Sequence, residues 1–115
     1  EIVHMFRDVG YSAIRIPVSA PSKEPLPDVF AIKDDAILSI EVKSQVRYAY
    51  YKSHQVLKLF EFLEIHKIYP RKYAVLAAKF KYKGWWFDVA ERSDRDYMIK
   101  INQGISWNEL LAKIT

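Results

Sequence analysis

Apolar and polar positions along the chain predict a mixed α/β fold. Residues 1–9 have a broad apolar side and end at Gly10, where a helix C-cap glycine belongs. Alternating or continuous apolar runs predict strands over 12–18, 28–33, 36–44, 73–82, 85–89 and 97–101. Ser53 is expected to cap a helix over 54–66, and Ser106 with Glu109 forms a capping box that begins a last helix. This order predicts a central mixed sheet flanked by helices.

Two carboxylates and a lysine emerge at one end of the hairpin predicted over 28–44. In its second strand Leu38, Ile40 and Val42 share one face, whereas Glu41 and Lys43 share the other. If the turn at 34–35 closes the hairpin, the beginning of the first strand lies beside the end of the second. The pattern therefore predicts that Asp28 and Glu41 converge.

This arrangement is suited to a divalent metal. Asp28, Glu41 and the backbone carbonyl of Val42 would form the oxygen-only kind of site that Mg²⁺ prefers, with several waters retained. In phosphodiester hydrolysis such a metal polarises the phosphate and lowers the pKa of a bound water. Lys43 would stand beside the attacked phosphate and stabilise its negative charge. The alternative is an ordinary surface hairpin, because Pro-Asp followed by Glu-x-Lys often occurs by chance.

Composition narrows the function classes only modestly. The chain has 115 residues, half of them hydrophobic, which suits a single domain over 1–115. The absence of cysteine excludes disulfides and thiolate metal sites, and no apolar run approaches the roughly 18 residues of a membrane span. The net charge of +4 is compatible with nucleic-acid binding without requiring it. Because the first residue is Glu1 and not Met, we expect the natural chain to extend further upstream.

Four segments carry a family resemblance, in the family's order and spacing. They are 14–19 (IRIPVS), 25–31 (PLPDVFA), 39–44 (SIEVKS) and the helix opening 54–56 (HQV). Together they resemble the archaeal Holliday junction resolvases and their archaeal viral relatives, within the PD-(D/E)xK nuclease superfamily. The resemblance covers 1–87 well and is weaker beyond, although segment 105–111 also resembles the family.

The resemblance implies a restriction-endonuclease-like fold and a homodimer. It also implies paired, symmetric nicking of four-way junction DNA, dependent on Mg²⁺ with Mn²⁺ as a substitute. The family's metal-binding Asp and Glu match Asp28 and Glu41, and its catalytic Lys matches Lys43. The implied location is the cytoplasm of an archaeal or virus-infected archaeal cell, and no membrane is involved.

Further positions follow from the same match. Arg15 corresponds to a basic residue on the first strand and is expected to contact phosphate, Ser19 corresponds to a loop serine near the site, and Gln55 to a glutamine close to the metal. The family also has a catalytic glutamate on its first helix, which would lie two positions before Glu1. We therefore do not give that role to Glu1.

The remaining expectations concern partners. Lys23 and Lys52 flank the site in the sequence and are expected to contact DNA backbones. In strand alternation Trp86 faces opposite to Trp85 and Phe87, so a second subunit is expected to cover one of the two faces. Two alternatives to a junction resolvase stay open: another nuclease of the superfamily, of restriction or repair type, and a non-catalytic DNA-binding module.

Overall fold

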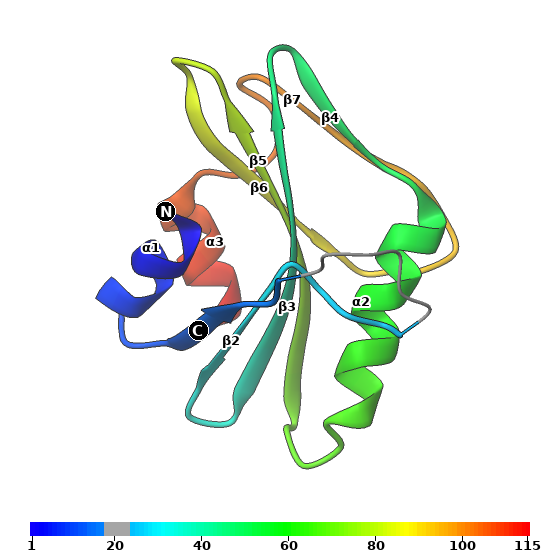
Figure 1. The fold of residues 1–115 in the computed structure, drawn as a ribbon. Helices are drawn as coiled ribbons and strands as arrows, with labels where there is room; N and C mark the ends of the chain where they lie inside the picture. The colour runs from blue at the N-terminus through cyan, green and yellow to red at the C-terminus, as the bar shows by residue number, and fades with distance from the viewer. Residues whose placement is uncertain (18–23) are drawn as a thin grey trace.

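A computed structural model describes residues 1–17 and 24–115 (Figure 1). Ser19 and Lys23 lie outside the described residues. Within these ranges the elements are α1 (Ile2–Asp8), β1 (Ser12–Arg15), β2 (Val29–Lys33), β3 (Ala36–Gln45), β4 (Tyr48–Tyr51), α2 (Ser53–Ile65), β5 (Arg71–Phe80), β6 (Gly84–Ala90), β7 (Tyr97–Lys100) and α3 (Trp107–Ile114). The expected order is confirmed, with β4 as an additional strand.

The central sheet is mixed, as expected. Its five strands have the order β1-β2-β3-β5-β6, in which β3 and β5 run parallel and the other neighbours are antiparallel. A parallel pair needs a crossover connection, and here α2 lies in the connection between β3 and β5. The two central strands are the longest, with ten residues each, and most of β5 is buried.

Helices cover both faces of this sheet, α1 and α3 on one and α2 on the other (Figure 1). Alternation along β3 decides which residue meets which layer. Leu38 and Ile40 pack in the cluster with α1 and α3, whereas Ile37 packs with α2. Ser39, also on the α2 side, is buried and donates a hydrogen bond to the Leu59 carbonyl at 3.1 Å. None of the described helices is long and apolar enough to cross a membrane.

The β4 and β7 strands form a separate antiparallel ribbon above α2 (Figure 1). The sequence predicted β7 but did not predict its partner, because the tyrosine-rich segment 45–52 has no clear period. Ala49, Tyr51 and Ile99 form the inner face of the ribbon and complete the core cluster on the α2 side. The ribbon therefore covers the part of the sheet that α2 does not reach.

The expected alternation of the aromatic residues in β6 is confirmed. Trp85 and Phe87 pack with the cluster that contains α1 and α3, and Trp86 packs with the cluster on the α2 side. The chain thus covers each of these faces with its own elements. The tryptophans do not require a second subunit for their burial, and the expected homodimer has no support from them.

Candidate active site

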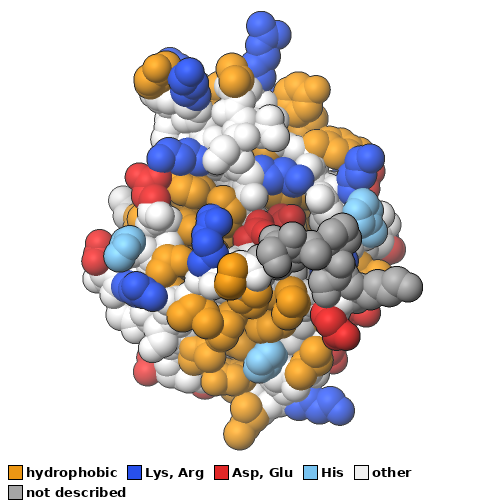
Figure 2. Space-filling view, viewed as in Figure 1, with side chains coloured by type: hydrophobic (Ala, Val, Ile, Leu, Met, Phe, Trp, Pro, Cys, Tyr) orange, Lys and Arg blue, Asp and Glu red, His pale blue; other side chains and the backbone are white. Residues whose placement is uncertain are grey.

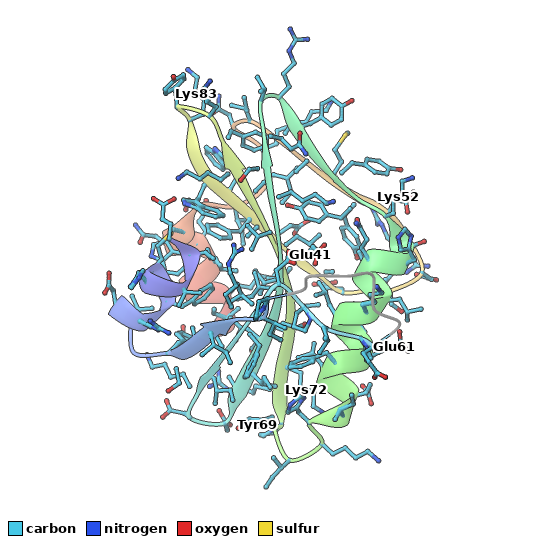
Figure 3. All side chains as sticks on the ribbon, in the orientation of Figure 1. Glu41, Lys52, Glu61, Tyr69, Lys72 and Lys83 are labelled. Carbon is cyan, nitrogen blue, oxygen red and sulfur yellow. The ribbon has the colours of Figure 1, made fainter. Side chains whose placement is uncertain are left out.

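Asp28 and Glu41 lie side by side at one end of the β2–β3 hairpin. The register pairs Val29 with Ile40, and the Asp28 N–H donates to the Ile40 carbonyl at 3.1 Å. Continuing this register by one residue places Asp28 opposite Glu41, on the face that α2 covers. Figure 3 shows Glu41 near the middle of the molecule, where β3 passes the upper end of α2. The convergence predicted from the sequence is present in the structure.

The two carboxyl groups interact directly. The pKa of Glu41 is raised to about 7, chiefly by burial and then by the charge and side-chain hydrogen bond of Asp28, while the charges of Lys43 and Lys58 oppose the shift. Asp28 Oδ2 also accepts a hydrogen bond from the Val42 N–H at 2.9 Å. The two carboxylates therefore repel each other, and binding of a proton or a metal cation would reduce this repulsion.

The donors fit a hard divalent cation. Both carboxylates supply oxygen, and an extended residue directs its N–H and C=O to the same strand edge, so Val42 presents its carbonyl on the side of Asp28. In residues 1–17 and 24–115 no group of three or more His, Asp or Glu side chains is placed to hold a metal. A site with two carboxylates suits Mg²⁺, which usually retains several water ligands when it binds to proteins. Asp28, Glu41 and Val42 would thus hold the ion.

Lys43 follows on the same face and lies over an aromatic ring. Its ammonium is 5.7 Å from the ring centroid of Tyr51, which is fully buried. The Tyr51 hydroxyl donates to the Ala77 carbonyl at 2.6 Å, and burial together with the charges of Glu41 and Asp28 raises its pKa. Tyr51 therefore stays neutral and offers Lys43 a fixed ring face.

Comparison with known proteins decides the family. The family model of the archaeal Holliday junction resolvases (Hjc) matches residues 1–115. The chain belongs to this family. The resemblance inferred from the four motifs is thereby confirmed.

Individual relatives of this resolvase-family chain come from archaea and an archaeal virus. The crossover junction endodeoxyribonuclease Hje of Saccharolobus islandicus is 38% identical over 111 residues, which span 96% of this chain and 81% of that protein. The protein of the same name from Saccharolobus solfataricus is 36% identical over the same shares. The crossover junction endodeoxyribonuclease of Sulfolobus islandicus rod-shaped virus 1 is 38% identical over 77 residues, 58% of this chain and 64% of that one.

A solved structure shows the shared fold. Hjc of Archaeoglobus fulgidus, described as a Holliday junction resolvase, superimposes with a TM-score of 0.75 at 24% identity, over 99% of this chain and 95% of that one. The restriction-endonuclease-like α/β fold expected for this resolvase-family chain is confirmed.

The residues expected to contact DNA do not all lie on the same side of the sheet. Arg15 is exposed and pairs with Val29, which puts its side chain on the sheet face opposite to the carboxylates. Lys52 is exposed at the N-terminus of α2 (Figure 3). Gln55 accepts a hydrogen bond from the Lys52 N–H at 3.1 Å, so it caps the helix. Lys52, and not Ser53 as expected, occupies the N-cap position.

Sequence reasoning missed two neighbours of the site. One is Tyr51, which lies in the tyrosine-rich segment 45–52, and only the pairing of β4 with β7 shows that Ala49 and Tyr51 face the core. The other is Lys58, whose charge lowers the pKa of Glu41. It lies three residues after Gln55, a spacing that puts both on the same side of a helix.

Two other charged residues have structural partners away from the carboxylates. Glu1 forms an ion pair with Lys79 and accepts a hydrogen bond from Trp85 Nε1 at 3.1 Å. Lys33 donates to the Val9 carbonyl at 2.8 Å and thus satisfies the end of α1.

Proposed function

We propose that this protein is a structure-specific endonuclease that resolves four-way DNA junctions by Mg²⁺-dependent phosphodiester hydrolysis, with paired symmetric nicks. The observation that carries the proposal is the Asp28–Glu41 pair with Lys43 beside it on one face of the sheet. Membership in the resolvase family supports the choice of junction DNA as the substrate.

Each site residue has a separate task in this proposal. Asp28, Glu41 and the Val42 carbonyl hold the metal, which requires Glu41 to lose its proton. The bound ion supplies a polarised phosphate and a water of lowered pKa, and Mn²⁺ is expected to replace Mg²⁺. Lys43 stabilises the negative charge that develops on the attacked phosphate, while Tyr51 holds the ammonium in place.

Contacts to the sugar-phosphate backbone would position the junction. Lys52 and Gln55 at the beginning of α2 lie on the carboxylate side of the sheet, and Arg15 emerges on the other face and would contact a different part of the DNA. Ser19 and Lys23, outside the described residues, remain proposed contacts. Such contacts weaken steeply as salt increases.

Two symmetric nicks call for two active sites related by a two-fold axis, and therefore for a homodimer. The sources of the relatives suggest the place of action, the cytoplasm of an archaeal cell or of one infected by a virus.

The test compares a synthetic four-way junction with a linear duplex that contains the same sequences. Wild-type protein is expected to cleave the junction at symmetric positions in Mg²⁺ or Mn²⁺ and to leave the duplex uncut, with no cleavage in EDTA. Equal cleavage of both DNAs would instead favour a restriction or repair nuclease. Binding of the junction without cleavage at any Mg²⁺ concentration would favour a non-catalytic module.

A further inference from the structure

The outer face of the β4–β7 ribbon is aromatic and exposed. Strand register pairs Tyr48 with Lys100 and Tyr50 with Met98 on this face. Tyr48, Tyr50 and Met98 are 54%, 43% and 47% exposed, whereas the alternate residues of the ribbon face the core. Exposed large apolar side chains on adjacent positions are unusual unless they contact a partner.

The Tyr50 ring is held in place by hydrogen bonds. Its hydroxyl donates to Asp96 Oδ2 at 2.7 Å, and Asp96 Oδ1 accepts from the Ser53 N–H at 2.7 Å. The tyrosine is thus connected to the beginning of α2 through one carboxylate. Its ring orientation is set before any ligand binds, which reduces the entropy lost on binding.

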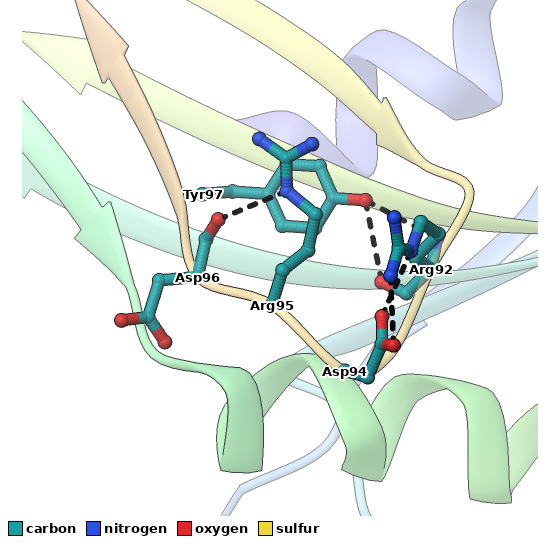
Figure 4. Close-up of polar contacts among 5 residues, drawn as sticks. All are labelled: Arg92, Asp94, Arg95, Asp96 and Tyr97. Carbon is teal, nitrogen blue, oxygen red and sulfur yellow. Dashed lines mark hydrogen bonds and ion pairs between the residues drawn. The ribbon is translucent and has the colours of Figure 1, made fainter.

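Polar contacts also hold the loop that carries Asp96 in place (Figure 4). Arg92 forms two hydrogen bonds of 2.9 Å to the Asp94 carboxylate, and the Tyr97 hydroxyl contacts the backbone of Arg92. The Arg95 guanidinium stacks 4.8 Å from the centroid of the Tyr97 ring. These contacts fix the segment before β7, so the ribbon presents a rigid surface.

A cavity of about 360 Å³ connects this surface with the active site. It is lined by Lys43, Gln45, Val46, Arg47, Tyr48 and Tyr50. The segment from Lys43 to Lys52 contains Arg47 as a further cation and no acidic residue. Figure 2 shows acidic side chains at the centre of this face, Lys and Arg side chains around them, and hydrophobic side chains toward the upper right. A DNA strand that extends from Lys43 along this cavity would therefore meet the positive charge of Arg47 and then the rings of Tyr48 and Tyr50.

The charge and shape of this surface favour nucleic acid over a second protein copy. A second copy related by a two-fold axis would bring Arg47 and Lys100 close to equivalent cations, which is unfavourable. A tyrosine ring flanked by cations is instead the common platform for unstacked bases, with the cations following the phosphates. Bases at the branch point of a four-way junction have lost part of their helical stacking and are available for such contacts.

We propose that the outer face of the β4–β7 ribbon binds nucleobases beside the branch point, which stack on Tyr48 and Tyr50 while Arg47 and Lys100 contact the adjoining phosphates. This inference rests on the proposed junction substrate and specifies how the branch point is distinguished from continuous duplex. The rings carry the preference for the junction, and the cations carry affinity common to all DNA.

The experiment measures dissociation constants for a four-way junction and a matched duplex in EDTA, where binding is separated from cleavage. Tyr48→Leu/Tyr50→Leu is expected to weaken junction binding about tenfold or more and duplex binding less than about twofold. Tyr48→Phe/Tyr50→Phe keeps the rings but loses the Tyr50–Asp96 hydrogen bond, so it should bind the junction within about threefold of the wild type and clearly more tightly than the double Leu variant. Tyr82→Leu is the matched control, because Tyr82 is 92% exposed at the β5–β6 turn.

Photo-cross-linking locates the contact directly. A junction with 5-iodouracil beside the branch point is expected to cross-link to the peptide containing residues 48–51 in the wild type, and to lose that cross-link in the double Leu variant. Circular dichroism checks that each variant is folded. Arg47→Ala should weaken junction and duplex binding alike and reduce the salt dependence of both.

Several results would overturn the inference. They are unchanged junction binding in the double Leu variant, equal losses for junction and duplex, or loss of binding accompanied by a change of oligomeric state in ultracentrifugation, which would identify the ribbon as a subunit interface. Failure of the proposed function is a separate outcome. In that case the wild type itself neither prefers nor cleaves the junction, whatever the tyrosine variants do.

Discussion

Asp28 is tied to the strand that carries Glu41, because its Oδ2 accepts the Val42 N–H at 2.9 Å. The same carboxyl group hydrogen-bonds to the Glu41 side chain. One side chain therefore closes the end of the hairpin and also supplies half of the proposed metal site. Substitutions at Asp28 can separate these two tasks, since an amide oxygen can accept the Val42 hydrogen bond but carries no charge.

Asp28→Asn is expected to reduce Mg²⁺-dependent junction cleavage by more than about 100-fold while junction affinity changes only a few-fold. Its stability should equal or exceed that of the wild type, because charge repulsion with Glu41 is removed. Asp28→Ala also loses the Val42 hydrogen bond and should be about 1 kcal/mol less stable in urea unfolding. Retained cleavage by Asp28→Asn would contradict the assigned site.

The metal-free protein is expected to lose stability as the pH rises through about 7. The pKa of Glu41 is about 7 in the folded state, above its ordinary value of 4.5. The stabilisation from its protonated form is therefore fully present below about pH 4.5 and is lost as the pH passes 7. Between pH 5.5 and 8.5 in EDTA, we expect wild-type protein to lose about 1–2 kcal/mol more than Glu41→Gln.

Urea titrations of both proteins at each pH measure this difference. Added Mg²⁺ should reduce the wild-type loss, because the deprotonated carboxylate binds the ion. Coincident pH profiles for wild type and Glu41→Gln would show that this carboxyl does not titrate differently on folding.

Tyr51 is expected to position Lys43 through its ring and not its hydroxyl. Tyr51→Leu removes the ring under the ammonium and should lower kcat about tenfold, with little change in the KM for junction DNA. Tyr51→Phe retains the ring and should keep kcat within about twofold, although loss of the bond to Ala77 costs about 1 kcal/mol of stability. Single-turnover cleavage measures these rates, and equal losses in both variants would indicate a structural role only.

Gly104 lies in the connection from β7 to α3, where it packs so closely against β6 that a side chain would clash. Its φ is +86°, and an added Cβ would lie 2.7 Å from the Phe87 carbonyl oxygen, next to the paired hydrogen bonds between Phe87 and Ile105. Gly104→Ala should therefore cost about 3 kcal/mol in urea unfolding. Gly84→Ala is the control, because its φ of +79° is similar but no atom lies within 4 Å, and it should cost about 1 kcal/mol. Similar losses in both variants would show that the carbonyl contact is unimportant.

Local patterns were sufficient to predict the centre of the site. Asp28 and Glu41 lie on one hairpin, and its turn at Asp34 and Asp35 joins the paired residues Lys33 and Ala36. Asp34 adopts a φ of +53°, a conformation that a short polar side chain tolerates. A short turn sets the register, and the two-residue alternation then decides which face each carboxylate occupies. This information is contained in about twenty consecutive residues.

The surroundings of the site depend on contacts between distant segments. Tyr51 faces the core because β4 pairs with β7, in which Tyr51 lies opposite Tyr97, and no local pattern specifies such a partner. The same pairing directs Tyr48 and Tyr50 outward. The sequence showed only that the segment is rich in tyrosine.

The sequence by itself thus determined the fold class, the hairpin and the convergence of Asp28 with Glu41, because alternation and turn chemistry act over short range. Only the tertiary structure decided how strongly Glu41 holds its proton and which ring lies under Lys43. Both depend on α2 and the β4–β7 ribbon, which bury one face of the sheet. Burial is a property of the assembled layers, and it changes the chemistry of side chains whose positions the sequence had already indicated.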